Sequence, residues 1–167
     1  LGGTFDTNTK QLVVKGAYPC RRTAGSDSTT SVELDPASQV IVKDEMATDG
    51  LIPVGWYHSH PIFEARPSAK DNENQRNYQA FAADKSTGLE PWVGMIIGPY
   101  DEQLPTPASH VQAWVVRSQN KNVIPYNIRY QKDPPKARIT PALVKRLESA
   151  LENLVGDPGR LNMQQLW

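Results

Sequence analysis

Two histidines, a serine and an aspartate in one short stretch are the residues of this sequence whose types and spacing could do chemistry. The stretch runs from His58 and His60 to Ser68 and Asp71. Imidazoles and carboxylates are zinc ligands, and a set of three protein ligands leaves the fourth tetrahedral position to water, as in catalytic zinc sites. The stretch therefore predicts one open Zn²⁺ site per chain, with His58, His60 and Asp71 as ligands.

The elements expected around these residues can bring them together. Residues 54–57 are apolar and predict a buried strand, in which His58 and His60 point to the same face because they are two residues apart. A proline ends the strand, and Ser68 begins a polar helix that carries Asp71 in its first turn. A strand end and a helix start would thus supply the three ligands.

Each half of the pattern also has an ordinary structural explanation. A histidine pair on a strand is more often part of the packing than of a metal site. Ser68 can simply cap a helix, at about 1 kcal/mol, while Asp71 favours the helix dipole. The two halves together, in the right order, favour the metal site.

The complete pattern, His-Ser-His-x7-Ser-x2-Asp from His58 to Asp71, resembles the motif of the JAMM, or MPN+, metalloprotease family. The likeness covers residues 1–130. Within the family the chain is most similar to the histone deubiquitinases that combine Myb-like, SWIRM and MPN domains. The family likeness is carried by residues 1–3, 31–36, 54–57 and 93–100. The likeness to these deubiquitinases is carried by residues 18–20 and 35–39 and by the Pro-Ser-x-x-Asp form of the motif.

The resemblance implies an α/β fold of the MPN (JAMM) type, with a central mixed β-sheet flanked by helices. It also implies a zinc-dependent isopeptidase that removes ubiquitin from lysine side chains with a zinc-activated water as nucleophile. Ubiquitin and ubiquitinated proteins, among them histones, would be its partners, which favours the nucleus over the cytoplasm. Ser68 is expected to donate to the oxyanion, a contribution of about 2.7–4 kcal/mol in other enzymes. Trp56, Ile62 and Phe63 are expected to line the substrate groove.

The chain departs from the family pattern at the general base. JAMM enzymes use a glutamate that lies a few residues before the Leu-Gly-Gly turn, and this chain begins at that turn. Glu33, Glu45 and Glu64 are not convincing replacements. We therefore expect a single MPN-type domain that lacks its most N-terminal segment. Its function is either that of a deubiquitinase in the complete protein or that of an inactive MPN scaffold, or ubiquitin- or partner-binding module. A hydrolase of small conjugates is less favoured.

Composition fits one intracellular globular domain, with 167 residues and 38% hydrophobic content. There is no apolar run of membrane-spanning length and no secretory leader. The single cysteine, Cys20, excludes an internal disulfide. The 18 basic and 18 acidic residues leave no basic field for nucleic acid. We expect neither a membrane partner nor direct nucleic-acid binding.

Hydrophobic patterns predict the other elements of the core, residues 1–132. Two helices are expected, one at 36–47 with Val40, Ile41 and Met46 inward and one at 71–83 with Tyr78, Phe81 and Ala82 inward. The expected strands are residues 11–17, 31–34, 92–97, 110–117 and 126–130. The loop from Pro99 to Pro107 is either an insertion that docks ubiquitin or an ordinary connection.

Residues 133–167 predict a C-terminal helical extension. Thr140 caps a helix with Pro141 at its first position, and the helix ends at Gly156. Its apolar residues recur at intervals of three and four, which predicts an amphipathic helix. They are Leu143, Val144, Leu147, Ala150, Leu151 and Leu154. This stripe packs either against the sheet or against a partner helix, as in the dimers of related MPN domains.

Overall fold

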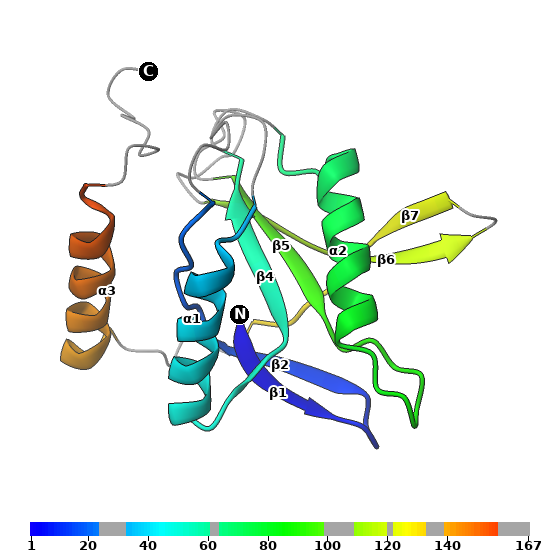
Figure 1. The fold of residues 1–167 in the computed structure, drawn as a ribbon, viewed down its shortest axis with the longest axis horizontal. Coiled ribbons are helices and arrows are strands. Elements are labelled where there is room, and N and C mark those ends of the chain that lie inside the picture. The colour runs from blue at the N-terminus through cyan, green and yellow to red at the C-terminus, as the bar shows by residue number, and fades with distance from the viewer. Residues whose placement is uncertain (24–32, 61–63, 99–108, 120–121, 133–138, 157–167) are drawn as a thin grey trace. The chain divides into compact units, whose positions relative to one another are not determined.

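A computed structural model describes residues 1–23, 33–60, 64–98, 109–119, 122–132 and 139–156 (Figure 1). The chain divides into two compact units, one of residues 1–27 and 31–130 and one of residues 28–30 and 131–167. The histidines and the aspartate of the predicted metal site all belong to the first unit.

Two sheets form the first unit. Strands β1 (Gly2–Asp6), β2 (Gln11–Gly16) and β3 (Ile52–Pro53) make an antiparallel sheet in the order β2-β1-β3. A mixed sheet in the order β4-β5-β6-β7 contains β4 (Gly55–Ser59), β5 (Val93–Gly98), β6 (His110–Gln119) and β7 (Asn122–Asn127). Strands β4 and β5 are parallel, and the other pairs are antiparallel. The predicted α/β fold with a mixed sheet is confirmed.

The first unit also contains helices α1 (Pro36–Thr48) and α2 (Ala69–Phe81). Figure 1 shows β4 and β5 running between them in this view. Helix α1 contacts β3, and α2 contacts β5, β6 and β7. Each helix has a side-chain cap at its start: Asp35 accepts from the Ser38 amide, and Ser68 accepts from the Asp71 amide. The cap of α2 thus places Asp71 at the end of the helix next to the histidines.

The core beneath the predicted site is built from large side chains of β4, β5 and β6. Trp56, Ile96, Trp114 and Val116 form one buried cluster with Ala65. Gly94 on β5 makes room for it, because a Cβ at Gly94 would lie 2.6 Å from the Trp114 indole. Close packing of this kind leaves little freedom to the strand that carries His58.

Gly94→Ala should therefore destabilise the protein by about 1–3 kcal/mol, the usual cost of overpacking a core. Gly98→Ala on the same strand is the matched control, because its Cβ would meet nothing closer than 3.7 Å. The free energies of unfolding in denaturant test this expectation. Equal losses in the two variants would contradict the role assigned to Gly94.

The predicted inward faces of both helices are partly wrong. Met46 is buried in α1, but Val40 and Ile41 are exposed, and the other buried positions are Ser38 and Val42. Ser38 can be buried because its hydroxyl accepts from the Arg21 amide.

In α2, Tyr78 packs against the core, whereas the Phe81 side chain is 87% exposed. The buried face of α2 consists of polar side chains instead: Asp71, Gln75 and Gln79. Hydrogen bonds that sequence patterns do not reveal therefore decide the face of this helix.

Strand boundaries differ from expectation mainly at the edges. Strand β7 covers 122–127 rather than 126–130, and β1 was not expected. In place of a strand at 31–34, Leu34 forms one isolated bridge with Arg22, and residues 31 and 32 lie outside the described residues. The Pro99–Pro107 loop also lies outside them.

The second unit contains the predicted C-terminal helix, α3 (Pro141–Leu154), with Thr140 as its N-cap. The Thr140 hydroxyl accepts from the Leu143 amide. Where its apolar stripe packs stays a prediction. Among the described residues, none of the helices combines the length and the apolar character needed to span a bilayer.

Candidate metal centre

Strand β4 brings the two histidines to its carboxyl end. His58 pairs with Ile96 of β5, and the His60 amide, one residue beyond β4, still donates to the Ile97 carbonyl at 3.0 Å. Backbone pairing thus fixes both residues, and the side chains face the same way because they are two positions apart. His58 is buried, and His60 is more accessible.

A capping box at the start of α2 orients Asp71. Its Oδ2 accepts from the Ser68 amide at 2.7 Å and from the Ser68 hydroxyl at 2.6 Å, while the Ser68 hydroxyl oxygen accepts from the Asp71 amide at 3.2 Å. These bonds leave Oδ1 directed at His58. Ser68 therefore supports the carboxylate in addition to capping the helix.

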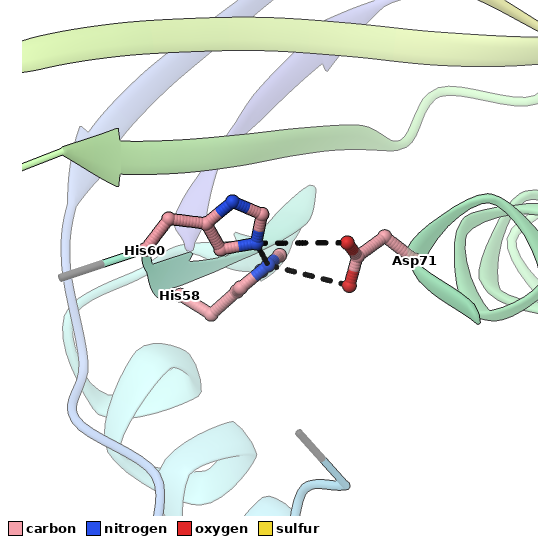
Figure 2. Close-up of side chains that lie close together, drawn as sticks. All are labelled: His58, His60 and Asp71. Atoms are coloured by element: carbon pink, nitrogen blue, oxygen red, sulfur yellow. Dashed lines mark hydrogen bonds and ion pairs between the residues drawn. The ribbon is translucent and has the colours of Figure 1, made fainter. Parts of the chain in front are cut away.

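The three predicted ligands converge, as Figure 2 shows. His58 Nε2 lies 3.0 Å from His60 Nε2 and 3.3 Å from Asp71 Oδ1, and His60 Nε2 lies 3.7 Å from Asp71 Oδ2. Ligand atoms at 2.0–2.1 Å from a tetrahedral zinc would be about 3.3 Å apart. The observed separations bracket this value, so the donor set fits the metal that the sequence predicts.

The protonation of His60 agrees with a role as ligand. Its Nδ1 lies 2.9 Å from the Glu64 carbonyl oxygen, which can only accept, so Nδ1 donates in this bond and Nε2 is the ring nitrogen left for a metal. This is the outer-shell bond that commonly orients metal-binding histidines. Within the described residues, His58 Nδ1 is buried and has no hydrogen-bond partner.

Asp71 is ionised across the neutral pH range. Burial raises the pKa of this carboxyl, but hydrogen bonds from His58 and Ser68 outweigh burial and lower the pKa from 3.8 to about 2. A negative charge beside two imidazoles is the electrostatic arrangement that attracts a divalent cation. Among the described His, Cys, Asp and Glu side chains, this is the one group of three at ligand spacing.

The structure places Trp56 in the core, which corrects its expected position in a substrate groove. Its side chain is 3% exposed and stacks on the His58 ring, with centroids 4.8 Å apart and planes 21° apart. Trp56 points to the same face as His58 and lies one step deeper in the sheet, where it supports the imidazole rather than a substrate. Ile62 and Phe63 lie outside the described residues.

The glutamates considered as general bases belong to other surroundings. Glu33 Oε1 is 3.8 Å from Lys70 Nζ, and Glu64 Oε1 is 3.2 Å from Arg66 Nε, in exposed ion pairs. Glu45 is exposed in the last turn of α1. None of the three belongs to the metal-ligand group of the described residues.

Sequence reasoning missed two residues next to the site, Gln75 and Gln79. They follow Asp71 at intervals of four on α2 and are buried with it. Gln75 accepts a hydrogen bond from Trp56. The signal in the sequence was the spacing: 71, 75 and 79 share one face of any helix that begins at Ser68.

Comparison with known proteins gives a family model and several relatives. The model of prokaryotic homologs of the JAB domain matches residues 4–116. The deubiquitinase MYSM1 of Mus musculus is 33% identical over 131 residues, which are 78% of this chain and 15% of that protein. The histone deubiquitinase MYSM1 of Xenopus laevis is 32% identical over the same shares.

An MPN domain-containing protein of Danio rerio is 42% identical over 101 residues, which are 60% of this chain and 21% of that protein. The chain thus matches only 15 to 21% of the length of these relatives. The similarity concerns one domain of larger proteins.

Proposed function

Because the chain belongs to the JAB/MPN family, we propose that it is a zinc-dependent isopeptidase that removes ubiquitin from lysine side chains of proteins. The observation that carries this proposal is the convergence of His58, His60 and Asp71 at ligand spacing at the end of β4 and the start of α2. Three protein ligands leave a position open for chemistry. The relatives named as deubiquitinases support the substrate class.

The residues of the site have distinct tasks in this proposal. When bound, zinc supplies a water whose pKa is lowered to about 7 and a Lewis acid that polarises the scissile carbonyl. His58 and His60 would hold the metal through their Nε2 atoms, and Asp71 offers a carboxylate that the capping box keeps in place. Ile62 and Phe63 remain proposed contacts for the ubiquitin tail.

Ser68 is proposed to donate to the oxyanion. Its hydroxyl has one proton, which the structure commits to Asp71 Oδ2 at 2.6 Å. Turning that proton toward substrate leaves Oδ2 with the Ser68 amide, at 2.7 Å, as donor. The carboxylate therefore stays oriented while the hydroxyl serves the reaction.

Ser68→Ala should lower turnover by about 10²–10³-fold, the usual effect of losing an oxyanion donor. Loss of the cap should cost only about 1 kcal/mol of stability, and zinc should remain bound. Single-turnover cleavage, zinc content and thermal melting separate these effects. Ser86→Ala, which removes a serine hydroxyl from an exposed turn beside Asp84, is the control. Normal cleavage by a Ser68→Ala protein that melts earlier would leave the serine a purely structural role.

A histone is the proposed substrate, because the Xenopus relative is named a histone deubiquitinase. Such a substrate would place the protein in the nucleus. The test of the function is cleavage of a lysine-linked ubiquitin conjugate by the zinc-loaded full-length protein, with a ubiquitinated histone compared with an unrelated conjugate. Release of ubiquitin that chelator stops and zinc restores is the expected result. No release from any conjugate would contradict the proposal.

The second candidate is an inactive MPN module that binds ubiquitin or a partner. The positions of Glu33, Glu45 and Glu64 favour it, since none of these described glutamates joins the metal-ligand group. Full-length protein that binds zinc and ubiquitin but cleaves nothing would select this alternative.

A further inference from the structure

We propose that Gln75 is a positioning residue for the metal site: through the indole of Trp56 it holds the His58 ring in the orientation that metal binding requires. The inference rests on the proposed zinc site and extends it, since Gln75 is not itself one of the ligands. Its basis is a second link between the same strand and helix that carry the ligands.

Two pairs of interacting side chains connect strand β4 with helix α2: His58 with Asp71, and Trp56 with Gln75. The strand carries Trp56 two residues before His58, and the helix carries Gln75 four residues after Asp71, so each pair shares a face. His58 Nε2 lies 3.3 Å from Asp71 Oδ1. Trp56 Nε1 donates to Gln75 Oε1 at 2.7 Å, and this bond is buried.

The indole forms the surface on which the His58 ring lies. The two rings are stacked at 4.8 Å, and the indole also contacts Tyr78 and Trp114, at centroid distances of 5.6 and 5.7 Å. Aromatic contacts alone allow the indole to slide in its plane, whereas its one polar atom is anchored to Gln75. A shift of the indole would move the support of the imidazole.

The Gln75 amide can take only one orientation. Both Nε2 protons are used, one by the Trp92 carbonyl at 3.1 Å and one by Gln79 Oε1 at 2.9 Å. If the amide were flipped, its NH₂ group would face the Trp56 N–H, and two donors would meet without an acceptor. Gln75 is fully buried, so no solvent is at hand to replace a lost bond.

Gln79 anchors the network to the sheet. Its Oε1 accepts from the Val116 amide at 2.8 Å, and its Nε2 donates to the Val116 carbonyl at 3.0 Å and to Glu90 Oε2 at 2.9 Å. The side-chain amide thus pairs with β6 as a neighbouring strand would. All four amide protons of Gln75 and Gln79 have acceptors, which makes the network rigid.

A purely structural helix would have no need of this arrangement. Apolar side chains in a core are often at least as stabilising as buried polar ones, whereas polar networks can select a single packing. Here every buried residue of α2 is polar and in register with Asp71. The network fixes the rotation of α2 against β4, on which the His58–Asp71 separation depends.

Gln75→Met tests the proposal, since methionine has a similar volume and makes none of these hydrogen bonds. We expect zinc affinity to fall tenfold or more, as is typical when outer-shell partners of a metal site are lost. We also expect a changed visible absorption spectrum of the Co²⁺-substituted protein. Chelator competition on the 167-residue chain, at a temperature where all variants are folded, gives the affinity.

Trp56→Phe supplies a second route to the same bond. It keeps an aromatic ring for stacking but removes the N–H donor. It should reproduce the Gln75→Met effect on zinc affinity. The double variant should bind zinc about as tightly as the single variant with the lower affinity, because both changes break the same Trp56–Gln75 hydrogen bond. Fully additive losses would contradict the proposed route.

Gln39→Met is the matched control. It makes the same substitution on α1, where the Gln39 amide donates to the Leu34 carbonyl at 3.1 Å, outside the network of Gln75 and Gln79. Its zinc affinity and Co²⁺ spectrum should stay close to those of the unsubstituted chain, whatever the change in melting temperature.

Two results would overturn the proposal: unchanged affinity and spectrum in Gln75→Met, or affinity losses in both Gln75→Met and Gln39→Met that simply follow their melting temperatures. The unsubstituted chain in the same titration separates the role of Gln75 from the proposed zinc site. If it binds no zinc, the metal site fails and this inference fails with it. If it binds zinc and Gln75→Met binds equally well, only the role of Gln75 fails.

Discussion

Asp71→Asn should lose tight zinc binding and all zinc-dependent cleavage while keeping the fold. The neutral amide cannot replace the carboxylate as an anionic ligand, so the loss of affinity should exceed the 10–100-fold effect of removing an outer-shell partner. An asparagine oxygen can still accept from the Ser68 amide, which preserves that bond of the helix cap. His58→Ala should have the same effect on zinc, because it removes the Nε2 atom that lies 3.0 Å from His60 Nε2 and 3.3 Å from Asp71 Oδ1.

Zinc content after chelation and reloading, measured by elemental analysis, is the primary readout. Glu73→Gln, which removes an exposed carboxylate paired with Lys70 on the same helix, is the matched control and should retain one zinc per chain. Full occupancy in Asp71→Asn or His58→Ala would show that the ligands have been assigned wrongly.

The site could be predicted from the sequence because its geometry is local. Two residues two apart on a strand share a face, and a serine three residues before an aspartate forms a capping box; both relations hold whatever the rest of the chain does. The structure brings His58, His60 and Asp71 together through these two local devices. Only the connection between the strand and the helix could not be predicted from local pattern.

The faces of the helices could not be predicted in the same way. The apolar residues of α1 and α2 do not form a clean stripe, so packing decides which side is buried. Phe81 is exposed, while Gln75 is buried because Trp56, Trp92 and Gln79 satisfy its amide. Partners that lie far apart in the sequence leave no periodic signal at Gln75 itself.

Trp56 shows the same limit for the site. Its aromatic side chain beside the histidines suggested a substrate contact, and the structure instead stacks it beneath His58. Whether an aromatic side chain lines a groove or lies in the core depends on which other segment of the chain packs against it. The residues next to Trp56 in the sequence do not show that packing.

The second prediction with a large expected effect concerns the general base of the proposed reaction. Glu33 and Glu64 are held in exposed ion pairs, and Glu45 is exposed at the end of α1. Zinc affinity should therefore be unchanged in each of three variants, Glu33→Gln, Glu45→Gln and Glu64→Gln. Cleavage by any active form of the protein should also be unchanged, since the backbone carbonyl of residue 64 still accepts from His60 Nδ1.

We expect residues 1–167 alone to bind zinc but to cleave a lysine-linked ubiquitin conjugate slowly. A general base must take a proton from the attacking water and return it to the leaving lysine amine, and such a group contributes about 10²–10⁴-fold. A longer form of the protein that carries a glutamate before Leu1 should cleave faster by this factor. Glu→Gln at that position should remove the gain without releasing zinc, because the three ligands lie within residues 58–71.

Single-turnover cleavage by the 167-residue chain, the longer form and its Glu→Gln variant, all zinc-loaded, makes the comparison. Equal zinc content in the three proteins assigns any difference in rate to the base rather than to the metal. Fast cleavage by residues 1–167, lost in one of the Glu33, Glu45 or Glu64 variants, would identify that glutamate as the base. It would also require a rearrangement that breaks an ion pair of Glu33 or Glu64, or that moves the end of α1 toward His58. The pairs on the surface should be worth at most about 1 kcal/mol each, so their strength alone would not prevent such a movement, and the cleavage comparison decides the matter.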